Sequence, residues 1–134
     1  MRHEKLVNDN QYLIGHFLLR AGIAFAFLYP PIAALADPLA WAAYFPDFVT
    51  RLPVSTTVLL HAFGVVEIII AVWIMSGRSI RIPAAIATVL LIGIMAANPG
   101  DFPVLFRDVT IAFGALALAF MPRPTARQLV NDGA

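Results

Sequence analysis

Four long runs of apolar residues dominate the chain, and short segments rich in proline, glycine and charged residues separate them. The runs cover residues 12–35, 56–75, 80–97 and 103–121. Each has about 18–24 residues, enough at about 1.5 Å of helix rise per residue to cross a hydrocarbon core of about 30 Å. The pattern predicts an all-α membrane protein, with residues 1–134 forming a single antiparallel bundle of four transmembrane helices.

The segment between the first two runs has a different character. Pro30 and Pro31 predict a kink or an early end of the first helix, because proline removes a backbone donor and disfavours helix at the preceding residue. Residues 37–53 follow and contain a group of aromatic side chains, which favour the headgroup zone of a bilayer. They predict a short amphipathic segment on the membrane surface, with an anchoring role favoured over that of a binding lid. The aromatic residues are Trp41, Tyr44, Phe45 and Phe48.

Composition supports the membrane assignment. The chain is 60% hydrophobic and 13% charged, whereas a soluble domain carries roughly 25% charged residues. A net charge of +1 gives no indication of a nucleic-acid partner. The absence of cysteine excludes disulfides and thiolate metal sites in this chain. The expected partner is the lipid bilayer.

Basic residues predict the orientation of the bundle. Four antiparallel spans would bring six of them to one side, and the positive-inside rule would place that side, with both termini, in the cytoplasm. The six residues are Arg2, Lys5, Arg78, Arg81, Arg123 and Arg127.

Two charged residues lie inside the apolar runs. Glu67 is near the middle of the second run and Arg20 is eight residues into the first. A carboxylate at that depth costs a few kcal/mol and normally has a partner. Counting at 1.5 Å per residue puts the two at depths of roughly 12–14 Å from the same face. We therefore expect an Arg20–Glu67 ion pair, with His16 and Thr88 completing a polar cluster. A purely structural tie and a ligand or proton site are both open at this stage.

A second polar cluster is expected near the opposite face. His61 lies early in the second run, Asn98 ends the third, and Arg107 and Asp108 open the fourth. Asp108 shares a helical stripe with alanines and so should point into the bundle. Headgroup anchoring and helix capping are favoured over a binding role for this cluster.

The sequence carries no metal-ligand spacing. His16 and His61 lie roughly 16 Å apart in depth, too far to bind one haem iron together. We therefore expect neither a metal nor a haem.

Three segments carry a family resemblance: residues 18–28 in the first run, Gly64–Ile68 with the following Gly77-Arg78, and Phe106–Val109. Through these segments the chain resembles the DoxX family of small four-helix bacterial and archaeal membrane proteins. The chain departs from the family pattern at residues 29–33, where many members have glycine and lysine. The resemblance implies a prokaryotic cell membrane protein with Arg20, Glu67, Arg107 and Asp108 as motif residues.

What the resemblance implies about function is a place in a membrane redox complex, since family members are linked to quinone-reducing thiosulfate oxidation and to an oxidative-stress complex. We expect a non-catalytic membrane subunit or anchor of an oxidoreductase complex, with a redox partner protein and a pocket for a quinone or another small ligand near Arg20 and Glu67. Two alternatives stay open. One is a small-solute transporter or channel, for which four short helices would require a homo-oligomer, and the other is a purely structural membrane protein. The residues alone do not decide whether the chain is an enzyme.

Overall fold

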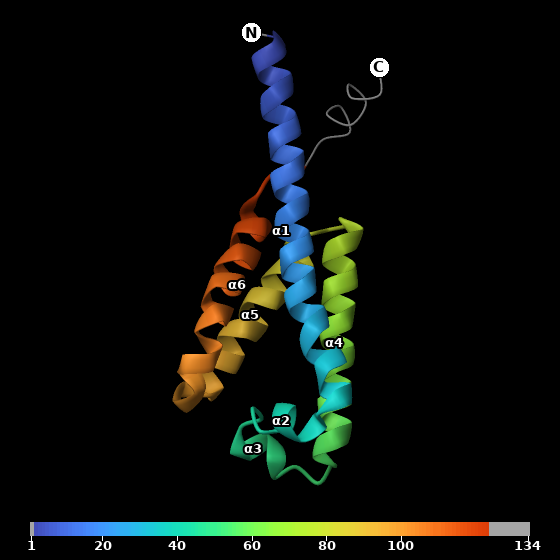
Figure 1. The fold of residues 1–134 in the computed structure, drawn as a ribbon, viewed down its shortest axis with the longest axis vertical. Coiled ribbons are helices and arrows are strands. Elements are labelled where there is room, and N and C mark those ends of the chain that lie inside the picture. Colours follow the sequence, from blue (N-terminus) through green and yellow to red (C-terminus); the bar gives the residue numbers. More distant parts are fainter. Residues whose placement is uncertain (1, 124–134) are drawn as a thin grey trace.

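The computed structural model describes residues 2–123 of the chain, with side chains described from residue 9 onward. All regular secondary structure in this part of the chain is helical (Figure 1). The elements are α1 (Arg2–Ala36), α2 (Pro38–Ala42), α3 (Asp47–Thr50), α4 (Thr56–Ser76), α5 (Arg81–Ala97), the 3-10 turn η1 (Pro99–Asp101) and α6 (Phe102–Phe120).

Three of the helical segments are long and apolar enough to cross a membrane: residues 9–36, 56–76 and 99–120. The fourth apolar helix, α5, is shorter, with 17 residues. All four helices also expose large apolar side chains, for example Phe25, Val72, Val89 and Phe113. Continuous apolar surface of this kind suits lipid and not water. These properties indicate an integral membrane protein.

The long helices form two pairs. α1 packs along α4, and α5 packs along α6. In Figure 1 the pairs come together toward the end where residues 77–80 join α4 to α5, and α2 and α3 lie at the opposite end. We call the first the turn end and the second the cavity end. Small residues fill the centre of the turn end, where Ala71, Ala84 and Ala115 are fully buried.

The first helix does not end early at its prolines. α1 continues through Pro30 and Pro31 to Ala36, so of the two alternatives expected there, a kink or an early end, the early end is excluded. The close approach of α1 and α4 explains what happens here. A Cβ atom at Gly64 would lie 2.9 Å from the Cβ atom of Pro31. Glycine lets the two backbones approach, and the packing of α4 against Pro31 then holds this part of α1 in place.

The turn between α4 and α5 is tight. Gly77 ends α4 in the left-handed conformation, with φ of 73°, which glycine adopts without steric cost. The indole Nε1 of Trp73 donates to the carbonyl oxygen of Arg78 at 2.9 Å and closes the turn. At the other end, α5 stops at Ala97, beside the Asn98 that was expected to end the third apolar run, and η1 follows. Asp101 occupies the N-cap position of α6, but its side chain makes no capping hydrogen bond.

Candidate functional site

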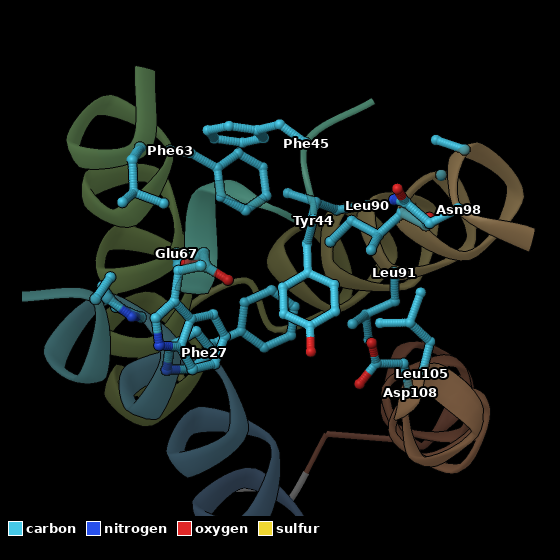
Figure 2. Close-up of a pocket in the computed structure, with 18 of the residues that line it drawn as sticks. Phe27, Tyr44, Phe45, Phe63, Glu67, Leu90, Leu91, Asn98, Leu105 and Asp108 are labelled. Carbon is cyan, nitrogen blue, oxygen red and sulfur yellow. The ribbon is translucent and has the colours of Figure 1, made fainter. Parts of the chain in front are cut away.

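The main feature of the cavity end is a cavity of about 600 Å³. It lies between the two helix pairs, and residues from α1, α4, α5 and α6 form its walls. Residues of α2, α3 and the turn between them also line it. Its walls are mostly apolar and aromatic, with a few polar groups (Figure 2). Small-molecule sites typically have volumes of about 300–1,000 Å³ and this kind of lining.

Glu67 is the most deeply buried ionisable group on this cavity. Its side chain comes from the face of α4 that carries Gly64 and Ala71, and the residue is 8% exposed. No hydrogen bond or ion pair joins it to another residue in the part of the chain that the structure describes, and its carboxyl oxygens keep accessible surface on the cavity. Figure 2 shows its carboxyl group directed into the cavity. A buried carboxyl group without a protein partner is costly, so its presence here requires an explanation.

A second carboxyl group reaches the cavity from the opposite wall. Asp108, on the first half of α6, is partly buried, and Figure 2 shows its carboxyl group turned toward the cavity. Arg107 also lines the cavity, but its Nε atom is 3.9 Å from Asp108 Oδ1 and its side chain is 59% exposed. Such a long, exposed ion pair is weak. Asp108 points inward as its stripe predicted.

Asn98 ends α5 at the edge of the same cavity. Its Nδ2 atom donates to the carbonyl oxygen of Ile94 at 2.9 Å, which uses one of the two amide hydrogens. This bond satisfies a carbonyl in the last turn of α5 and fixes the amide beside the cavity. Asn98 therefore combines the expected capping role with a place in the site.

The segment between α1 and α4 covers the cavity. Trp41 and Tyr44 both line it, and their rings lie 6.2 Å apart. Phe45 lines it as well and meets Phe63 of α4 edge-on, with ring centroids 6.3 Å apart. Only Phe48 of the four aromatic residues is strongly exposed. Trp41, Tyr44 and Phe45 thus line the cavity, whereas Phe48 does not, and the anchoring and lid roles both stay predictions.

Arg20 does not pair with Glu67, so this expectation was wrong. Its Nε atom donates to the carbonyl oxygen of Ile74 at 2.9 Å, and a second guanidinium nitrogen donates to that of Met75. These carbonyls belong to the last turn of α4, seven and eight residues, or roughly 10–12 Å, along the helix from Glu67. The depth count failed because α1 extends past the end of α4, and because unpaired helix-end carbonyls offered Arg20 nearer acceptors.

The remaining candidate residues lie outside the cavity lining. His16 is buried and its ring packs against Tyr12, with centroids 6.0 Å apart. Thr88 is buried on α5 and donates to the carbonyl oxygen of Ala84, one turn earlier, at 2.9 Å. His61 is exposed on α4. The members of the two predicted clusters are thus arranged differently in the structure. Glu67 lines one cavity with Asn98, Arg107 and Asp108, whereas Arg20, His16, Thr88 and His61 lie outside its lining.

The sequence analysis did not predict that Glu67 and Asp108 face the same cavity. It also ranked a lid formed by the segment of Trp41 and Tyr44 only second. One signal was available. Glu67 and Asp108 both lie on helical stripes that carry small residues, which indicated that both face the interior.

In the described residues, no group of three or more histidine or acidic side chains could hold a metal ion. Comparisons of the chain with protein-family models, with curated proteins and with solved structures find no match.

Proposed function

We propose that the chain is a DoxX-like integral membrane protein of the prokaryotic cell membrane, in which α1, α4, α5 and α6 all cross the bilayer as an antiparallel bundle. α5 has 17 residues, or roughly 25 Å at 1.5 Å per residue, and local thinning of the bilayer accommodates such a shortfall at modest cost. Its pairing with α6 along its length supports a spanning position.

The orientation we propose places both termini in the cytoplasm. Arg78 and Arg81 lie at the turn end, and Arg123 follows α6 at the same end. Tyr12 of α1 donates to the carbonyl oxygen of Pro122, which also brings these segments together. The positive-inside rule then assigns the turn end to the cytoplasm. Arg127 and the side chains of Arg2 and Lys5, on which the prediction also relied, lie outside the described residues.

The function that the cavity supports best is binding of an amphipathic ligand in a non-catalytic membrane subunit of an oxidoreductase complex, with a quinone as the ligand. One observation carries this proposal: a buried, unpartnered Glu67 opens onto an apolar cavity of about 600 Å³. Quinone carbonyls accept hydrogen bonds, which the Tyr44 hydroxyl and the second Asn98 amide hydrogen are able to donate. A carboxyl group beside them is suited to exchange protons. Arg20, near which the pocket was expected, and His16 of the same predicted cluster lie outside the cavity lining.

The same geometry supports binding over transport. The cavity reaches Glu67 but not Arg20. Toward the turn end, Ile74, Ala84 and Ala115 are fully buried and fill the space between the helices. In the described part of the chain, a solute path would have to break this packing. The purely structural alternative relied on an Arg20–Glu67 tie, which the hydrogen bonds of Arg20 do not support.

Tryptophan fluorescence tests the proposal, because the chain has two tryptophans and only Trp41 lines the cavity. In a Trp73→Phe variant, Trp41 is the single indole, and in a Trp41→Phe variant Trp73 serves as the matched reference. A short-chain ubiquinone added to the protein in nanodiscs should quench Trp41 with saturation, because a bound quinone lies within contact distance of the ring. It should quench Trp73 weakly and without saturation.

Equal, unsaturated quenching of both indoles would mean that the quinone only dissolves in the lipid, and the proposal would fail.

The assignment to an oxidoreductase complex is tested separately. The chain, purified from its native membrane after mild cross-linking, should carry a soluble redox enzyme. If only unrelated proteins are recovered, the assignment to an oxidoreductase complex falls, whatever the cavity binds.

A further inference from the structure

The charges on the cavity wall point to a ligand feature that the quinone proposal does not require. Two carboxyl groups, Glu67 and Asp108, face the cavity, and Arg107 is the one basic residue among its described lining residues. Arg107 interacts with Asp108 at 3.9 Å and is mostly exposed. If both acidic groups are ionised, the wall carries a net negative charge in a low-dielectric setting, where an uncompensated carboxylate is expensive.

The aromatic residues on the same cavity favour a positively charged group. Trp41 and Tyr44 come from the covering segment and Phe27 from α1, and all three line the cavity. Figure 2 shows the side chain of Tyr44 between those of Glu67 and Asp108 in that view. Aromatic ring faces attract an ammonium group within about 6 Å, most strongly where water is excluded.

We propose that Glu67 and Asp108 form the binding site for the head of an amphipathic organic amine, with its apolar tail along the walls of α1 and α4. An ammonium group supplies the hydrogen-bond donors that both carboxyl groups lack, and its single positive charge balances the net negative charge that remains beside Arg107. A bare metal ion fits less well, because calcium takes six to eight oxygen ligands at about 2.4 Å and two carboxylates supply at most four. This inference rests on the cavity of the proposed function, but not on quinone binding.

A matched pair of ligands tests the inference: 4-phenylbutylamine, which is charged at neutral pH, and 4-phenylbutanol, which has nearly the same shape and no charge. Binding is followed by the fluorescence of Trp41 in the full chain carrying Trp73→Phe, in nanodiscs of neutral lipid. The wild-type cavity should bind the amine roughly 30-fold or more tightly than the alcohol, as expected for a buried, hydrogen-bonded charge pair.

Variants of the two carboxyl groups show which residue causes the preference for the amine. Glu67→Gln should remove most of the preference for the amine and leave the affinity for the alcohol unchanged. Asp108→Asn should remove a smaller part, because Asp108 is less buried and already has Arg107 beside it. The double variant should bind the two ligands equally. His61→Gln, an exposed change on the same helix and outside the cavity lining, should retain the full preference.

Three outcomes would overturn the inference: equal binding of amine and alcohol by the wild-type cavity, a preference that persists in the double variant, or no binding of either ligand. The first two, together with saturable quinone quenching, would leave the proposed function in place. Conversely, a Glu67-dependent preference for the amine without quinone binding would support the inference and refute the quinone. A native circular dichroism spectrum and a single size-exclusion peak confirm the fold of each variant.

Discussion

At the turn end, the charged side chain of Arg20 donates to the carbonyl oxygens of Ile74 and Met75, and Ala71, Ala84 and Ala115 are fully buried nearby between the helices. At the cavity end, the carboxyl group of Glu67 meets an open volume of about 600 Å³ and no protein partner within the described residues. The same helix, α4, carries both environments. A charge satisfied within the protein is explained by stability, whereas one left unsatisfied is better explained by a ligand.

The packing of α1 against α4 at the cavity end depends on Gly64. Its backbone lies against Pro31 where α1 and α4 cross, just beyond Glu67 toward the cavity end. Gly64→Ala places a Cβ atom 2.9 Å from the Cβ atom of Pro31, and one of the two helices must shift. We expect a loss of about 1–3 kcal/mol in the free energy of unfolding, the largest effect among these predictions.

Thermal unfolding in nanodiscs measures this loss, with Gly22→Ala as the matched control. Gly22 also lies on a membrane helix, α1, but a Cβ atom there would have nothing within 4 Å. It should leave stability unchanged or raise it by up to about 1 kcal/mol, because alanine is the better helix former. If Gly64→Ala behaves like the control, close packing at Pro31 does not hold α1 against α4.

Arg20→Met tests how much the hydrogen-bonded guanidinium group of Arg20 contributes to stability. It removes two hydrogen bonds to the last turn of α4 while keeping an apolar side chain of similar length. We expect a loss of about 1.5 kcal/mol, the low end for bonds to a charged group, because Arg20 is only partly buried. Arg20→Lys should recover part of it, since lysine keeps the charge but not the forked geometry.

Arg81→Met, an exposed change at the start of α5, is the control for charge loss at the turn end and should be nearly neutral. Equal losses for Arg20→Met and Arg81→Met would indicate that net charge, and not the contact with α4, stabilises this end.

The sequence predicted the elements better than their partners. The expected boundaries 56–75 and 80–97 differ from α4 and α5 by a single residue at most, because apolar periodicity, glycine and proline act locally. The prediction of an Arg20–Glu67 pair depended on the position of α1 along α4, which no local sequence pattern indicates. The covering role of Trp41 and Tyr44 depended on how far apart the two helix pairs lie at the cavity end. That spacing is a property of tertiary packing.

A double-mutant cycle compares the two ends directly. Glu67→Gln should change stability by less than about 0.5 kcal/mol or raise it, because the carboxyl group has no protein partner to lose. Combined with Arg20→Met, the two effects should add, with a coupling energy below about 0.5 kcal/mol, because the residues do not touch. Unfolding of the four proteins under the same conditions gives the coupling. A coupling energy of about 1 kcal/mol or more in favour of the wild-type pair would indicate that Arg20 and Glu67 interact, contrary to the structure.

The smallest effect is expected at Thr88, which the sequence placed with Glu67 in one polar cluster. Its hydroxyl donates to the carbonyl oxygen of Ala84 on its own helix, and it lies outside the cavity lining. Such a bond within a helix adds little stability, so Thr88→Val, which keeps the shape, should change the free energy of unfolding by less than about 0.5 kcal/mol. Ligand affinity, measured by Trp41 fluorescence, should also stay the same. A clear loss of affinity without a loss of stability would show that the site extends from the cavity along α5, and that the boundary between the two ends lies closer to the turn than the cavity walls indicate.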